Sequence, residues 1–166
     1  MDGLRWSTLL LVASLGLASS CTSEEPDTPS EPVTFEGLVE DHRGGIEGTL
    51  TDCGSVDLSA NECSMELSSQ EQCLWDAFNA CELAELELIL PTTDAGPLPT
   101  HLFVRMGNYG CEIDLFTDHS NDGFKGDYGD FTHDACTQLQ GDLPDPEACD
   151  QLLPLECERV DEWWAD

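Results

Sequence analysis

The sequence predicts an α+β fold: a small, disulfide-rich domain in which one main helix packs on an antiparallel sheet of three to five strands. Three observations support this fold class. Residues 68–81 carry the signals of a helix, and three segments within residues 82–117 show the alternation of side chains that is typical of strands. Eight cysteines are spread over residues 53–157 with no C-x-x-C pair among them, which favours structural disulfides over a zinc ribbon or a thioredoxin-type redox site.

The predicted helix begins at a capping box, in which Ser68 and Glu71 each satisfy a backbone amide that the first helical turn leaves without a partner. Apolar residues then recur at helical spacing and form one stripe about three turns long. Eight helical residues separate Cys73 from Cys81 by about 12 Å, which exceeds the roughly 7 Å limit for a disulfide. Each of these two cysteines must therefore bond to a different partner.

Three strands are expected after the helix. Residues 82–90 alternate leucine with glutamate or isoleucine, which predicts a strand. Because Ala, Glu and Leu are also good helix formers, an extension of the helix to Pro91 is the alternative. Residues 102–106 and 111–115 alternate in the same way, and the turn sequence at residues 107–110 predicts that they pair as a hairpin. A longer Pro- and Gly-containing link predicts a second hairpin loop between the first two strands.

The folded domain is expected to span residues 36–166. Near its start, Gly44 and Gly45 indicate a turn, and Ile46, Thr49 and Leu50 indicate the beginning of a strand.

The last part of the chain holds three cysteines and a pair of tryptophans. Cys136 is expected to tie its segment back onto the sheet, while Cys149 and Cys157 are near enough in sequence to close a small loop of their own. The full disulfide connectivity stays open, because eight cysteines allow too many pairings to choose between. Trp163 and Trp164 indicate either a patch docked on the core or an exposed adhesive surface.

The composition is strongly acidic, with 35 acidic and 5 basic residues among 166 and a formal net charge of −30. Nucleic acid is not expected as a partner, since phosphate contacts need clustered lysine or arginine. The acidity indicates a highly soluble surface, with a dedicated cation-binding role as the alternative.

The first 20 residues have the features of a signal peptide. Arg5 supplies a positive charge near the start, and the apolar core at residues 9–17 is far shorter than the roughly 20 residues of a membrane-spanning helix. Small residues at 18–20 then precede Cys21. This Leu-Ala-Ser-Ser-Cys stretch resembles the lipobox of bacterial lipoproteins, and the resemblance implies cleavage before Cys21 and a diacylglycerol on its thiol. Cleavage by an ordinary signal peptidase, which would leave Cys21 as a free thiol, is the alternative.

The lipoprotein resemblance implies an exported chain that is anchored through Cys21 to the bilayer of the bacterial cell envelope, with the outer membrane weakly favoured by Thr22. Residues 21–35 are rich in Glu, Asp, Pro, Ser and Thr and are expected to form a disordered acidic tether. Setting Cys21 aside leaves an even number of cysteines, which suits four disulfides in an oxidising compartment. These candidate disulfide residues are Cys53, Cys63, Cys73, Cys81, Cys111, Cys136, Cys149 and Cys157.

An acidic loop at residues 118–130 holds the candidate metal ligands. Oxygen-bearing side chains stand at positions one, three and five of a calcium-binding pattern and a glycine at position six, but the glutamate that closes an EF-hand is missing. A plain acidic turn is the alternative. The nearby His119 and His133 are expected to be scattered surface histidines rather than zinc or copper ligands. The residues that would line a calcium site are Asp118, Ser120, Asp122 and Asp130.

No catalytic pattern is present: Gly-x-Ser-x-Gly, His-Glu-x-x-His and Gly-rich phosphate loops are all missing, and the cysteines are expected to be oxidised. The sequence therefore predicts a non-catalytic binding or interaction module with an unidentified envelope partner and no cofactor. A calcium-binding or structural envelope component is the first alternative. A secreted inhibitor with a cystatin-like helix-on-sheet shape is the second, by fold analogy alone.

Overall fold

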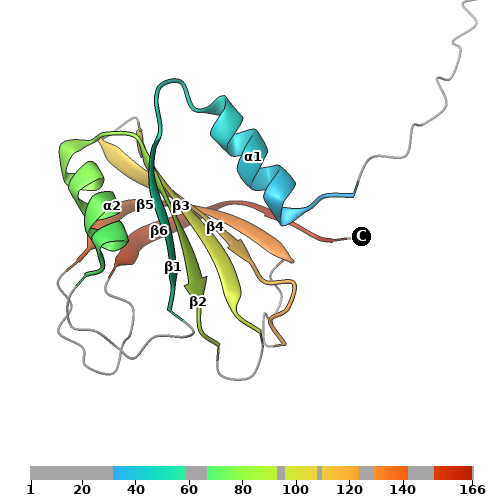
Figure 1. The fold of residues 1–166 in the computed structure, drawn as a ribbon. Coiled ribbons are helices and arrows are strands. Elements are labelled where there is room, and N and C mark those ends of the chain that lie inside the picture. Colours follow the sequence, from blue (N-terminus) through green and yellow to red (C-terminus); the bar gives the residue numbers. More distant parts are fainter. Residues whose placement is uncertain are drawn as a thin grey trace, which may run out of the picture. The chain divides into compact units, whose positions relative to one another are not determined.

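Two helices and a six-stranded sheet make up the part of the chain that the computed structural model describes (Figure 1). That part consists of residues 32–58, 67–92, 96–107, 110–123, 129–141 and 152–165, all within one compact unit, residues 31–166. The predicted signal peptide and Cys21 lie outside it. In chain order the elements are α1 (Phe35–Gly45), β1 (Thr51–Asp57), α2 (Ser69–Ala80), β2 (Ala84–Leu90), β3 (Leu98–Met106), β4 (Cys111–Asp118), β5 (Phe131–Gln140) and β6 (Leu153–Trp163).

The strands lie side by side in their sequence order, from β1 to β6. β1 runs parallel to β2, and every other neighbouring pair is antiparallel. The predicted α+β class and the disulfide-rich character are confirmed. The expected number of elements is wrong, because the described residues form a second helix and a mixed sheet of six strands.

Helix α2 and the strands after it form as predicted. Ser68 Oγ accepts a hydrogen bond from the Glu71 N–H at 3.2 Å, and Glu71 Oε2 accepts one from the Ser68 N–H at 2.8 Å, which completes the capping box. The helix ends at Cys81, whose left-handed backbone (φ 59°) turns the chain away. The residues that follow therefore form strand β2 from Ala84 rather than an extension of the helix, and β3 and β4 pair as the predicted hairpin.

Helix α1 was not expected from the sequence. Thr34 caps its first turn by accepting a hydrogen bond from the Gly37 N–H at 3.1 Å. Phe35 and Val39 are buried one turn apart and form the apolar side of the helix.

The turn and strand predicted near the start of the domain are corrected by this helix. Gly44 and Gly45 are the last residues of α1 rather than a turn between strands, and β1 begins only at Thr51. The apolar Ile46 and Leu50 pack against the cluster beneath α1 instead of starting a strand.

Disulfides join the second helix to the sheet and the last two strands to each other. The three in the described residues, with their Cα–Cα distances, are Cys53–Cys73 (5.7 Å), Cys81–Cys111 (5.3 Å) and Cys136–Cys157 (3.9 Å).

Two of the sequence predictions about the cysteines can be compared with these bonds. Cys73 and Cys81 reach different partners, one on β1 and one on β4, as the helix geometry requires. The small loop predicted between Cys149 and Cys157 is wrong, because Cys157 stands opposite Cys136 in the β5–β6 register and bonds to it. Cys63 and Cys149 lie outside the described residues.

The two helices pack on opposite faces of the sheet. Alternate residues of a strand point to opposite sides, and each helix contacts a different one of these two sets. On the α2 face the buried side chains are mainly aliphatic, such as Leu86, Leu102 and Ile113. On the α1 face the buried apolar side chains are mainly aromatic, such as Phe103 and Phe116. The α1 face also carries the ionisable side chains from which a site can be built.

Candidate functional site

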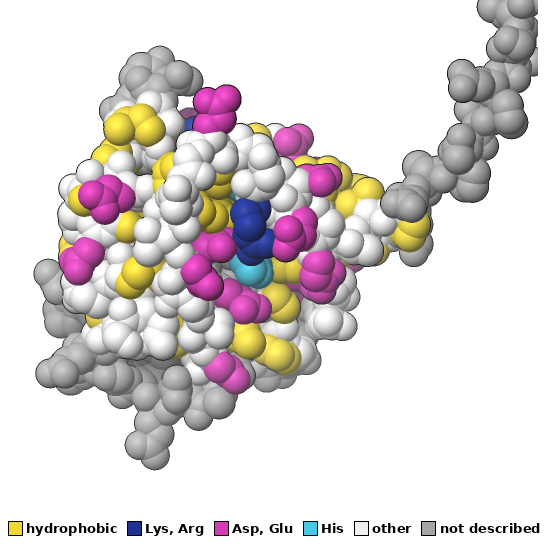
Figure 2. All heavy atoms as spheres, turned by 45° about the horizontal axis from the view of Figure 1, so that its top comes forward, with side chains coloured by type: hydrophobic (Ala, Val, Ile, Leu, Met, Phe, Trp, Pro, Cys, Tyr) yellow, Lys and Arg dark blue, Asp and Glu magenta, His cyan; other side chains and the backbone are white. Residues whose placement is uncertain are grey.

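The sheet face beneath α1 is charged, although a face that a helix covers is normally apolar. Figure 2 shows basic and histidine side chains gathered at one place on the surface, with acidic side chains around them. The pairing of the strands places these ionisable residues of β2, β3, β4 and β5 on one side of the sheet: Glu85, Glu87, His101, Arg105, Glu112, Asp114 and His133.

Asp114 is the centre of this face, and its side chain is completely buried. Arg105 binds both of its oxygens, with Nη2 at 3.2 Å from Oδ1 and Nε against Oδ2. His133 Nε2 lies 2.9 Å from Oδ1. From α1, the buried His42 Nε2 lies 3.2 Å from Oδ2 without the alignment of a hydrogen bond. A buried carboxylate is tolerated only when it is paired in this way.

The charge of Asp114 is stabilised by its neighbours. Burial by itself would raise the pKa of this carboxyl, but the contacts with His133, His42 and Arg105 outweigh burial and hold its pKa well below the ordinary range. The bond to Asp114 in turn raises the pKa of Arg105. Asp114 and Arg105 therefore form a permanent ion pair inside the domain.

Aromatic rings enclose the two histidines of this cluster. The His42 ring lies 5.0 Å from the ring of Phe103 and 4.7 Å from that of Phe116, measured between centroids. His133 stacks on Phe116 with centroids 4.3 Å apart and an interplanar angle of 8°. The rings hold both imidazoles in place. Because His42 belongs to α1, its contacts with Asp114 and with the two phenylalanine rings fix this helix on the sheet.

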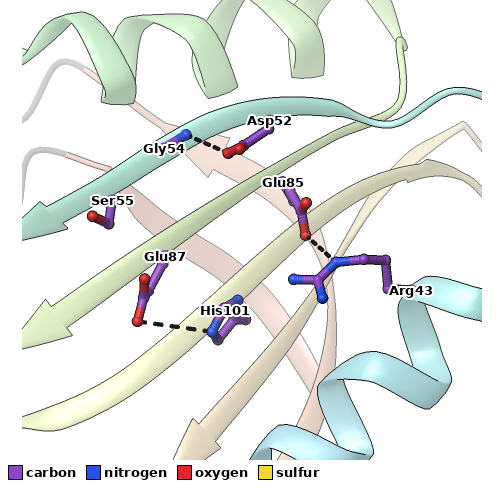
Figure 3. A pocket seen from close by; sticks show the side chains of 7 residues that line it. All are labelled: Arg43, Asp52, Gly54, Ser55, Glu85, Glu87 and His101. Atoms are coloured by element: carbon purple, nitrogen blue, oxygen red, sulfur yellow. Dashed lines mark hydrogen bonds and ion pairs between the residues drawn. The ribbon is translucent and has the colours of Figure 1, made fainter.

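A polar pocket of about 290 Å³ lies beside the last turn of α1, where Arg43 lines it (Figure 3). His42 and Arg43 are neighbours on that turn; the first points to Asp114 and the second to the pocket. The residues that line the pocket come from α1, β1, β2 and β3: Arg43, Asp52, Gly54, Ser55, Glu85, Glu87 and His101.

The wall of the pocket on β1 depends on a glycine. The β1–β2 register shifts between Asp52 and Ser55, and Gly54 takes a left-handed backbone (φ 89°) within this bulge. The Gly54 N–H donates to Asp52 Oδ1 at 2.7 Å. Because of the bulge, Asp52 and Ser55 stand opposite Glu85 and Glu87, and all four side chains line one wall.

The pocket is negatively charged. It has three carboxylates, on Asp52, Glu85 and Glu87, against the single guanidinium of Arg43. Arg43 Nε donates to Glu85 Oε2 at 2.8 Å, and this bond raises the pKa of Arg43. Burial lowers the pKa of His101, although Glu87 Oε1 at 4.0 Å from its Nε2 acts in the opposite direction. Near neutral pH the imidazole of His101 is therefore uncharged, and the pocket keeps its negative charge.

In the candidate calcium loop, two of the carboxylates accept hydrogen bonds from backbone amides, one within the loop and one after the end of β6. Asp118 Oδ1 accepts a hydrogen bond from the Ser120 N–H at 2.8 Å, and Asp130 Oδ2 accepts one from the Ala165 N–H at 2.8 Å. The Asp122 N–H also donates to the backbone oxygen of His119 at 2.9 Å, so Asp118, Ser120 and Asp122 lie in one acidic turn. Within the part of the chain that the structure describes, no group of three or more His, Cys, Asp or Glu side chains is arranged to hold a metal ion.

The two histidines predicted to be scattered on the surface are both engaged. His119 Nε2 lies 3.1 Å from Thr132 Oγ1. The prediction is wrong for His133, whose side chain is only 12% exposed between Asp114 and Phe116.

The two tryptophans were predicted to be either docked on the core or exposed, and each outcome holds for one of them. Trp163, at the end of β6, stacks on Phe116 with ring centroids 6.5 Å apart, whereas Trp164 is 55% exposed.

The Asp114 cluster and the pocket were both missed from the sequence. One signal was available. In β3 and β4 alternate residues are mainly apolar and point to one face of the sheet, and the residues between them point to the other face. Arg105 and Asp114 belong to this second set, together with Phe103 and Phe116. A charged residue among aromatic ones on a covered face indicates a buried ion pair.

Comparison of the chain with protein-family models found no match, and comparisons with curated proteins and with solved structures found none either. Neither of the two described helices has the length and apolar character that a membrane span requires.

Proposed function

We propose that this protein is a lipid-anchored, non-catalytic binding module of the bacterial cell envelope, and that its ligand site is the pocket between α1 and the first three strands. The observation that carries the proposal is a polar cavity whose charged walls are held in place before any ligand arrives. Arg43 is fixed by Glu85, and Asp52 is fixed by the Gly54 N–H. Groups that are already ordered lose little conformational freedom on binding, which favours affinity.

The order of the polar residues across the strands supports binding rather than catalysis. Ser55 on β1 stands opposite Glu87 on β2, which stands opposite His101 on β3. A serine nucleophile needs the imidazole as its direct neighbour and the carboxylate behind it. Here the carboxylate lies in the middle, and the hydroxyl and the imidazole are two strand spacings apart, or roughly 9–10 Å.

The disulfides agree with an exported protein, since such bonds persist in oxidising compartments. The lipid anchor itself rests on the resemblance of residues 17–21 to a lipobox. Attachment at Cys21 would leave the acidic tether between the bilayer and the domain, with the outer membrane as the favoured site.

The anchor can be tested by metabolic labelling with a radioactive fatty acid in a bacterial host. We expect the full-length chain to be labelled and the Cys21→Ala variant not to be, because the diacylglycerol is attached to the Cys21 thiol. Equal labelling of both chains would contradict the assignment. A Cys53→Ala variant, which alters a disulfide of the domain, is expected to keep its label and serves as the control.

The pocket can be tested by photo-crosslinking in the native envelope. A photoreactive amino acid placed at position 55 of the full-length chain, in the pocket wall, is expected to capture a ligand or partner. The same amino acid at position 158, on the exposed outer strand β6, is expected to capture none. Adding Glu87→Gln should reduce the capture at position 55 by about tenfold, the loss of one charge-assisted contact. Equal capture at both positions would refute the pocket as the site.

A further inference from the structure

The pocket has two halves, and one of them already holds a cation. In the half beside α1, the guanidinium of Arg43 binds Glu85 and also contacts Glu40. In the other half, the wall is made by Ser55 of β1, Glu87 of β2 and His101 of β3. Among the described residues, Glu87 forms an ion pair only with His101, at 4.0 Å, and with no arginine or lysine.

We propose that the half of the pocket at Glu87 binds a primary ammonium group, carried by a small amine or by a lysine side chain. The inference rests on the proposed role of the pocket as the ligand site. Arg43 shows that a cation is accommodated against the β2 carboxylates, and it occupies only the Glu85 side of the cavity (Figure 3).

The groups around this half match the donors of an ammonium. A primary ammonium is compact and carries three N–H donors. Around Glu87 the available acceptors come from three adjacent strands: the Ser55 hydroxyl, the Glu87 carboxylate and the ring of His101. The Glu87 side chain is 41% exposed, so a ligand reaches it from solvent.

The state of His101 makes the binding dependent on pH. Its burial keeps the imidazole neutral near pH 7, so its ring nitrogen can accept a hydrogen bond. In acid the imidazole gains a proton, and its positive charge then competes with the ligand for Glu87. The other charged groups that act on His101 are Arg43, Glu85 and Glu36. Arg43 opposes this protonation and the two glutamates favour it.

The experiment is calorimetric titration of the full-length mature chain at constant ionic strength. The probes are butylamine for a free amine, the acetylated methylamide of lysine for a side chain in a protein, and tetramethylammonium as a cation without N–H donors. We expect at least one of the two amines to bind about tenfold or more tightly than tetramethylammonium. The tighter of the two amines identifies the source of the ligand group. Tetramethylammonium binding as tightly as both amines would overturn the proposal, because diffuse charge attraction would then explain the binding.

Two variants with the same change of charge separate a site from the general acidity of the chain. Glu87→Gln is expected to weaken amine binding by about tenfold or more, and Glu158→Gln on the exposed face of β6 to leave it unchanged. Ser55→Ala, which removes a hydroxyl without changing the charge, is expected to weaken it less. Equal affinities for the Glu87 and Glu158 variants would refute the site, provided that their circular dichroism and melting match those of the parent chain.

The pH profile provides a separate test. Amine affinity is expected to fall as the pH is lowered through the pKa of His101, which burial holds below the ordinary histidine value of about 6.5. The fall should disappear in His101→Gln, and a fall that persists there would contradict the role of His101.

If position 55 captures a ligand in the envelope while no amine binds, the ammonium assignment fails and the proposed binding function stands. If neither occurs, both fail.

Discussion

Replacing Asp114 with asparagine is expected to lower the free energy of unfolding by about 3–5 kcal/mol at neutral pH, the typical cost of removing one partner of a buried ion pair. The variant loses a fully buried charge and leaves Arg105 with Glu112 as its remaining acidic partner. It also weakens the contacts of His42 and His133, and therefore the attachment of α1. Equilibrium unfolding in urea, followed by tryptophan fluorescence with the disulfides intact, measures the change.

A matched variant and a pH series make this prediction specific. Asp161→Asn makes the same substitution at an exposed position of β6 and is expected to change stability by no more than about 0.5 kcal/mol. Because folding lowers the pKa of Asp114, its stabilising effect is complete above the unfolded-state pKa of about 3.9 and is lost as the pH falls towards the folded-state pKa. The difference between the parent and Asp114→Asn should therefore shrink below about pH 4. A difference that stays constant in acid would show that shape, not charge, is what the variant removes.

Removing the Cys81–Cys111 disulfide is expected to have the second large effect, a loss of about 3–4 kcal/mol. This bond closes a loop of 30 residues and joins the end of α2 to the start of β4, so the unfolded chain without it has far more conformations to lose on folding. The double variant Cys81→Ala, Cys111→Ala is compared with the parent by urea unfolding under non-reducing conditions. Cys21→Ala, which changes a residue of the predicted tether outside the described residues, is the control and should unfold like the parent. A loss below about 1 kcal/mol would show that other contacts already restrict this loop in the unfolded chain.

The elements of the fold that depend on residues close together in the sequence could be predicted. The capping box at Ser68 places the start of α2, and the alternating residues after it place β2, β3 and β4. Helix α1 was missed because Gly44 and Gly45 were interpreted as a turn. Its available signals were a capping threonine and apolar residues at helical spacing, at Phe35 and Val39.

The order of the sheet could not be predicted in the same way. β1 pairs with β2 across the whole of α2, with Thr51 opposite Ala84, and no local pattern indicates a parallel neighbour so far along the chain. The β5–β6 pair carries a cross-strand disulfide, Cys136–Cys157, whose partners are 21 residues apart. Such pairings depend on register and topology, which spacing alone does not reveal.

The candidate site also depends on residues that are far apart in the sequence. Asp114 collects partners from positions 42, 105 and 133, and the pocket is assembled from four elements between Arg43 and His101. The calcium-like pattern at residues 118–130 was found because it is contiguous. In the structure its Asp118 and Asp130 carboxylates bind the backbone amides of Ser120 and Ala165, whereas the charged cavity lies on the face under α1.

The two helices differ in how they are fastened. α2 is linked covalently to the sheet through Cys73 and through Cys81 at its end, whereas no cysteine occurs between Cys21 and Cys53, so no disulfide fastens α1. If the chain is tethered at Cys21, any mechanical load on the anchor enters the domain through α1. Under tension this helix would detach first and expose the Asp114 cluster, while the cross-linked remainder would resist extension.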